Sequence, residues 1–137
     1  VMVLDAANAS TGELLVNTIG AYQGTTAWGI SAFGDGVNLQ ITADGDWSVQ
    51  ILPMGAAPGL APSGVGDAVF VYDGPVGALT ATHAGSSNFA VIEETSDAFS
   101  IGLLVNEIGA YSGTVPLSAG PSVIVVKADG AWTMGVQ

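Results

Sequence analysis

The chain has 137 residues, enough for one ordinary domain or two small ones. It carries twelve carboxylates against a single basic residue, Lys127, and the resulting net charge of −11 leaves no basic cluster for binding nucleic acid. There is no cysteine for a disulfide or a thiolate, and no apolar run approaches the ~18–20 residues of a membrane span. We therefore expect neither a nucleic-acid partner nor membrane insertion.

Charged residues make up only 9 % of the chain, against roughly 25 % in an average soluble domain. The surface must therefore carry Ser, Thr, Asn, Gly and Ala with some apolar groups. The hydrophobic fraction of 49 % is too high for a disordered acidic segment. A weakly charged surface of this kind is associated with secreted proteins, so we expect an extracellular or cell-surface location.

The first unit, residues 1–52, is expected to consist of short strands. Residues 1–5 form a short apolar run typical of a buried strand, and residues 14–17 and 19–25 are predicted as two further strands with a bend at glycine. Apolar and polar residues alternate over 37–42 and again over 47–51, with Asp44-Gly45 between them. This alternation around an Asp-Gly turn predicts a two-stranded hairpin.

Residues 53–66 contain three prolines among Gly and Ala, and they are predicted to be a linker. The second unit, residues 67–137, is predicted to begin with strands at 68–72, 79–84 and 89–92. A hairpin of 122–127 with 132–136 is predicted to close it. Short strands punctuated by Gly, Pro and Asp predict an all-β protein made of two antiparallel β-sandwich units.

One stretch occurs twice and relates the two units. Residues 14–25 read LLVNTIGAYQGT, and residues 103–114 read LLVNEIGAYSGT. A second echo follows, since ADGDW at 43–47 corresponds to ADGAW at 128–132. The offset falls from 89 to 85 between the two echoes, because the loop 28–36 is longer than its counterpart by the difference of four residues. Repetition of this kind predicts two related structural units.

The first unit lacks a counterpart of residues 67–89. By the offset of 89, Val1 aligns with Ala90, so two strands and the start of a third are missing. A sandwich without them exposes an apolar face and unpaired strand edges, which natural proteins avoid. The missing strands are either cleaved off or unresolved, or they are supplied by the second unit, the linker or a neighbouring copy.

An apolar outer face is the first predicted contact surface. Val123 and Val125 stand where the first unit has outward-facing Asn38 and Gln40, and Thr133 is predicted to lie beside them. An exposed apolar patch of this kind usually marks an interface. We expect copies of the chain to associate through such β-sheet contacts, as a homo-oligomer or polymer.

The longer loop of the first unit is the second predicted contact surface. Trp28 and Phe33 lie in it and have no aromatic counterpart in the second copy. Aromatic residues on a surface loop often form a binding site. The predicted interface is thus Val123, Val125, Thr133, Trp28 and Phe33.

The sequence offers few candidates for catalytic, metal-binding or sugar-binding residues. Trp47 and Trp132 have the inward phase of an alternating strand, which favours a place in the core over a sugar-stacking platform. His83 has no second His or Cys with which to form a metal site or a triad. Calcium binding at Asp35, Asp44 and Asp46 stays open, although the Asp44-Gly45 pair is explained by a turn. No catalytic residue, metal or cofactor is predicted.

Taken together, LLVNxIGxYxGT, ADGxW and the Ser87-Asn88-Phe89 stretch resemble a β-rich repeat unit of secreted or surface proteins of bacteria and archaea. The resemblance implies an extracellular β-sandwich and no catalysis. Two classes of function remain. The first is a structural or interaction protein of the cell exterior, such as a subunit of a self-assembling filament or sheath. The alternative is a glycan- or ligand-binding module of a larger secreted protein.

Overall fold

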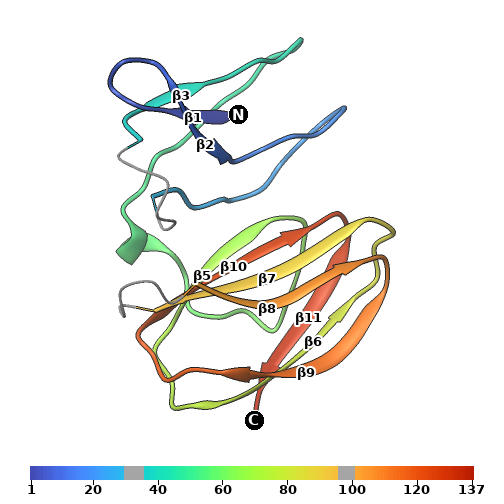
Figure 1. Ribbon diagram of the computed structural model, residues 1–137. Coiled ribbons are helices and arrows are strands. Elements are labelled where there is room, and N and C mark those ends of the chain that lie inside the picture. The colour runs from blue at the N-terminus through green and yellow to red at the C-terminus, as the bar shows by residue number, and fades with distance from the viewer. Residues whose placement is uncertain (30–35, 96–100) are drawn as a thin grey trace.

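The computed structural model describes residues 1–29, 36–95 and 101–137. It is all-β and contains three antiparallel sheets, one in the N-terminal unit and two in the C-terminal unit (Figure 1). The predicted fold class, an all-β protein with a sandwich, is confirmed. No helix in the described ranges is long and apolar enough to cross a membrane.

The C-terminal unit is a sandwich of two four-stranded sheets. The first sheet has the order β5 (Ala68–Tyr72), β10 (Ser122–Ala128), β7 (Asn88–Thr95) and β8 (Ile101–Ile108). The second has the order β4 (Ser63–Val65), β11 (Ala131–Val136), β6 (Gly77–His83) and β9 (Tyr111–Leu117). All neighbouring pairs are antiparallel.

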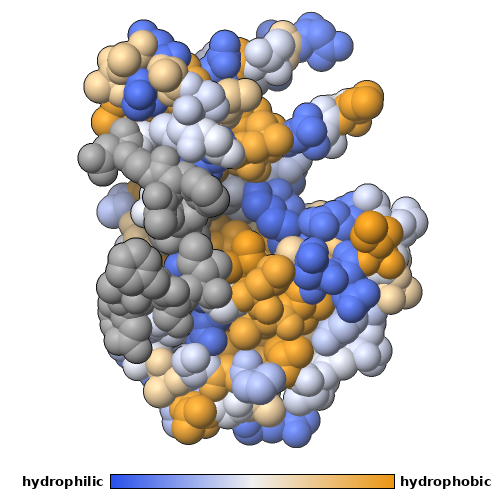
Figure 2. All heavy atoms as spheres, viewed as in Figure 1, coloured by the Kyte–Doolittle hydropathy of each residue, from blue (hydrophilic) through white to orange (hydrophobic). Residues whose placement is uncertain are grey.

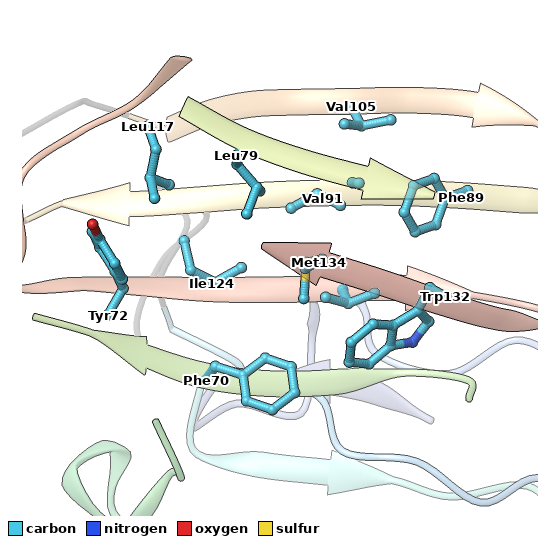
Figure 3. Close-up of a cluster of buried hydrophobic side chains, with 12 residues drawn as sticks. Phe70, Tyr72, Leu79, Phe89, Val91, Val105, Leu117, Ile124, Trp132 and Met134 are labelled. Atoms are coloured by element: carbon cyan, nitrogen blue, oxygen red, sulfur yellow. The ribbon is translucent and has the colours of Figure 1, made fainter. Parts of the chain in front are cut away.

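Side chains of alternate residues fill the space between the two sheets (Figure 3). Phe89 and Leu79 come from different sheets, and each is fully buried. The rings of Phe70 and Trp132 meet edge to face with their centroids 5.7 Å apart. Successive residues of a strand point to opposite faces of its sheet, so each sheet has one apolar face. The two apolar faces pack against each other and form the core.

The predicted closing hairpin of the C-terminal unit is wrong. β10 and β11 belong to different sheets, so the chain crosses the sandwich at Asp129-Gly130 instead of reversing within one sheet. The crossing places Trp132 in the core opposite Phe70. Gly130 is needed because a Cβ there would lie 2.6 Å from the Cα of Gly85, closer than real Cβ atoms approach.

The repeated stretch likewise spans both sheets. β8 ends at Ile108, the chain turns at Gly109, and β9 continues in the opposite sheet. Gly109 has a φ of 91°, which a residue with a side chain adopts only with strain. Its counterpart in the first copy, Gly20, has a φ of 93°. The predicted bend at this glycine is therefore present in both copies.

Part of the predicted linker belongs to the C-terminal unit. A short 3-10 helix, η1 (Met54–Ala56), is followed by a segment that pairs with the sandwich. The backbone N–H of Val71 donates to Pro58 O, and that of Met134 donates to Pro62 O. β4 then forms the edge of the second sheet, so the sandwich begins before the predicted boundary at residue 67.

The N-terminal unit has one sheet, with the order β2 (Ser10–Leu14), β1 (Met2–Leu4) and β3 (Asn38–Gln40). Met2 pairs with Leu14 and with Gln40. In the C-terminal unit Ile92 pairs with Leu103 and with Val125, the sequence counterparts of those two partners. The sheet β2-β1-β3 thus repeats the order and the pairing register of β8-β7-β10. In this register Met2 corresponds to Ile92, one residue away from the sequence alignment of Val1 with Ala90.

Candidate functional site: an open strand position in the N-terminal unit

Two segments of the N-terminal unit extend from its sheet without forming strands. We call residues 15–28 the first arm and residues 41–53 the second arm (Figure 1). Residues 42–52 make no backbone hydrogen bond to any other described residue. The strands predicted at 14–17, 19–25 and 47–51 are therefore absent, apart from Leu14 at the end of β2.

The C-terminal unit shows which strand the arms lack. There β6 lies between β9 and β11 and pairs with both. His83 is opposite Tyr111 on one side and Trp132 on the other, and Ala81 is opposite Gly113 and Met134. In the N-terminal unit the counterparts of β9 and β11 are residues 22–28 and 46–51, and no described residue of that unit lies paired between them. We call this place the open strand position.

Burial of the aromatic residues differs between the two units for this reason. Trp132 is 2 % exposed, whereas Trp47, its counterpart, is 61 % exposed. The expected core position of Trp132 is confirmed, and that of Trp47 is wrong in this structure. A core Trp needs a partner strand and an opposite sheet to cover it, and Trp47 lacks the strand.

Other apolar side chains of the arms are also uncovered. Val49 and Ile51 on the second arm are 49 % and 65 % exposed, and Ile19 at the tip of the first arm is fully exposed. Figure 2 shows hydrophobic atoms at the free end of this arm. Monomeric soluble proteins seldom expose apolar residues over such long unpaired segments.

The first arm nevertheless keeps local features of β9. In addition to the matching φ angles of Gly20 and Gly109, the tyrosine that follows lies over the next glycine in both copies. A Cβ added at Gly24 would meet the Tyr22 hydroxyl, and one added at Gly113 would meet the Tyr111 hydroxyl. The arm thus keeps two local features of an edge strand, although no strand among the described residues pairs with it.

His83 connects β6 to two corners of the C-terminal sandwich. Its Nδ1 lies 2.8 Å from Gly109 O, and its Nε2 lies 3.3 Å from Asp129 Oδ1. The imidazole stacks on Phe89, with ring centroids 4.6 Å apart. Because the side chain is fully buried, these contacts give the histidine an architectural role. Sequence reasoning did not predict this role, since the partners lie far away in the chain.

Asp129 stabilises the same corner. Its Oδ2 accepts hydrogen bonds at 3.0 Å from the backbone N–H groups of Ser86 and Ser87. Desolvation raises the pKa of Asp129, but those two N–H groups and His83 outweigh it and hold the pKa below the usual 3.8. Its counterpart Asp44 is exposed at the tip of the second arm.

A pH-dependent difference between these two carboxylates is expected. Because the pKa of Asp129 is lowered by folding, its contribution to stability is present above pH 3.8 and is lost as the pH falls through the folded-state value. Asp129→Asn should lower the melting temperature at pH 6, and the difference from the parent should shrink at lower pH. Asp44→Asn is the matched control and should leave the melting curve unchanged. Equal effects of both variants would contradict this assignment.

Lys127 and Asp67 join the first arm to the C-terminal sandwich. Lys127 Nζ donates to Leu15 O at 2.9 Å and to Thr26 Oγ1 at 2.6 Å, and it lies 3.2 Å from Asp67 Oδ2. Asp67 also accepts from the Tyr22 hydroxyl at 3.0 Å. Burial and the Asp67 carboxylate raise the pKa of Tyr22, so this hydroxyl keeps its proton and remains a donor. We call this group the junction.

The predicted interface residues of the C-terminal unit do not form one surface. Val123 and Val125 lie on the outer face of β10, whereas Thr133 lies in the other sheet, where its hydroxyl is 2.6 Å from that of Thr82. Val125 is only 3 % exposed. Lys127 on the same face contacts the first arm, so this face lies against the N-terminal unit within one chain. Contact between copies through Val123 stays a prediction.

The remaining predicted residues are placed as follows. Trp28 is half-buried at the end of the first arm. Phe33 and Asp35 lie outside the described residues. Asp44 and Asp46 are exposed near the tip of the second arm. Across the described ranges, no group of three or more His, Cys, Asp or Glu side chains is arranged to hold a metal ion.

One buried carboxylate has no counterpart among the predicted sites. Glu93 on β7 is 3 % exposed, and its carboxylate accepts a hydrogen bond from the backbone N–H of Ser118 at 3.1 Å. It lines a crevice of about 290 Å³ with Leu104 and Leu117. Because the Glu93 carboxylate is hydrogen-bonded to the loop after β9, Glu93 joins β7 to that loop. The fold therefore explains why this carboxylate is buried.

Comparison with known proteins gives no relative: no protein-family model, curated protein or solved structure matches the chain.

Proposed function

We propose that the protein is a non-catalytic structural or interaction protein of the cell exterior, which binds other chains through its N-terminal unit. The observation that supports this proposal is the open strand position. Two extended segments with exposed apolar residues flank it, and the counterparts of those segments in the C-terminal unit are paired through β6. Strand addition to such edges is a common mode of protein recognition.

The repeated sequence and the composition also support a structural or interaction protein of the cell exterior. We interpret the two units as tandem copies of one β-sandwich repeat, typical of extracellular proteins. If each chain offers an acceptor at one end, a neighbour that fills it head to tail would extend the assembly as a filament or sheath. Such an assembly would be held together by β-sheet contacts between copies.

Light scattering after size-exclusion chromatography, together with negative-stain electron microscopy, tests the assembly. The protein is expected to form oligomers or filaments as its concentration rises. Ile51→Asn, which adds a polar group at the exposed edge of the second arm, is expected to reduce association about tenfold or more. Val76→Asn is the matched control, because Val76 is also largely exposed, at 73 %, but lies in the C-terminal unit. A strictly monomeric parent would contradict the proposal.

Exposed Trp47 favours a second candidate, the binding of a glycan. An exposed indole offers a stacking face for a sugar ring, and Tyr22 of the first arm has a partly exposed ring. A glycan array with the parent and with Trp47→Ala distinguishes the candidates. Binding by a monomeric parent that is lost in the variant would favour the glycan-binding module, and no binding would remove it.

A further inference from the structure

The chemistry of β6 defines what the open strand position can accept. β6 reads GALTATH, with Leu79, Ala81 and His83 buried and the threonines between them facing outward. Thr80 and Thr82 bond to Thr114 and Thr133 on the outer face. The strand therefore has one apolar face that ends in a histidine, and one hydroxyl-bearing face.

The arms retain the groups that recognise each of these features. By sequence correspondence, a strand like β6 would place its histidine between Tyr22 and Trp47 and its alanine between Gly24 and Val49. Its leucine would meet Ile51. The apolar residues of the strand would then cover Trp47 and Val49, which are exposed in the chain by itself.

The histidine has the most specific partners. In the C-terminal unit His83 contacts Gly109 O and Asp129, and Asp129 also binds the N–H groups of Ser86 and Ser87. The counterparts Gly20 and Asp44 are present, and Gly20 has the same left-handed conformation as Gly109. Asp44 carries a carboxylate at the tip of the second arm, where it is exposed. A histidine followed by a Gly-Ser-Ser turn would complete this corner.

We propose that the open strand position accepts one antiparallel peptide strand with the pattern Leu-x-Ala-x-His-x-Gly-Ser-Ser, bound between the two arms. This proposal rests on the proposed function, because it names the partner chemistry of the same surface. It also fits the charge of the chain, since β6 and the turn up to Ser87 carry no carboxylate to oppose the net charge of −11. The register places the histidine of the incoming strand beside Asp44.

The test uses a synthetic peptide with the sequence of residues 76–87, VGALTATHAGSS, added to the full chain. Hydrogen exchange is followed by mass spectrometry. Binding is expected to slow exchange at least about tenfold over residues 22–28 and 47–51, with no change over β9 and β11. The control peptide exchanges Leu79 with Thr80 and Ala81 with Thr82, which keeps the composition but moves the apolar residues to the opposite face. It is expected to give no protection.

A double-mutant cycle tests the histidine corner. Asp44→Asn in the protein is expected to weaken binding of the parent peptide about three- to tenfold. The same variant should not further weaken a peptide that carries His83→Ala, because the partner group is already gone. Additive losses in this cycle would contradict the proposed pairing of the histidine with Asp44.

The outcomes separate this inference from the proposed function. Oligomers that form while the peptide neither binds nor inhibits them would overturn the strand pattern and leave the proposed function standing. A monomeric protein that does not bind the peptide would overturn both. Protection of the arms that rises with protein concentration and that excess peptide does not change would show that a second copy occupies the position through a different segment, and would overturn the strand pattern.

Discussion

Replacing Trp132 by alanine is expected to lower the free energy of unfolding by about 3–5 kcal/mol. The indole is 2 % exposed, packs edge to face on Phe70, and donates a hydrogen bond from Nε1 to Gly66 O at 2.9 Å. Alanine would leave a cavity between the two sheets and an unpaired carbonyl at Gly66. Denaturant unfolding monitored by circular dichroism measures the loss.

Trp47→Ala is the matched control, because the two residues occupy equivalent places in the repeated ADGxW sequence. Trp47 is 61 % exposed, so its removal from the monomer is expected to cost less than about 0.5 kcal/mol. A loss of several kcal/mol for both variants would show that Trp47 is buried in the isolated chain. That result would contradict the open strand position itself.

Lys127→Met is expected to lower stability by about 2–3 kcal/mol, somewhat less than for a fully buried ion pair. The variant keeps the apolar stem but removes the cation that contacts Leu15 O, Thr26 and Asp67. The Asp67 carboxylate, whose side chain is 14 % exposed, would remain without its charged partner. Exchange of the Thr25 N–H, which donates to Asp67 O, should also become faster as the first arm detaches.

Thr42→Ala provides the comparison for the junction. Thr42 is the sequence counterpart of Lys127 and is exposed on the second arm, so its replacement should change stability by less than about 0.5 kcal/mol. Combining Lys127→Met with Asp67→Asn should cost less than the sum of the two single variants, because the carboxylate is then no longer left unpaired. Strict additivity would show that the two residues do not interact.

The sequence predicted the fold class because the relevant signals are local. Alternation over β6 and β11, the apolar run of β10, and the Gly, Pro and Asp punctuation indicate short strands, and the structure contains them. The hairpin was mispredicted because an Asp-Gly turn between two alternating segments looks the same whether the chain reverses within a sheet or crosses between sheets. Burial of Trp132 opposite Phe70 decides between them, and that contact is not local.

The candidate site could be predicted only in part. The missing counterpart of residues 67–89 was visible from the repeat, and it correctly indicated unpaired edges in the N-terminal unit. The burial of Trp47 was mispredicted, because alternation gives the phase of a strand but not the presence of its neighbour. The junction was not predicted, because Lys127 and Asp67 are 60 residues apart and neither has the same residue type at an equivalent position in the N-terminal unit.

Hydrogen exchange of the monomeric fraction tests the central claim most directly, because it compares equivalent segments within one molecule. The amides of residues 47–51 are expected to exchange at nearly the rate of an unfolded peptide. Those of residues 132–136 in β11 are expected to be protected at least about a hundredfold. The same contrast should hold between residues 22–28 and β9, apart from Thr25 at the junction. Equal protection of the paired segments in a demonstrated monomer would contradict the claim that the N-terminal unit lacks a strand.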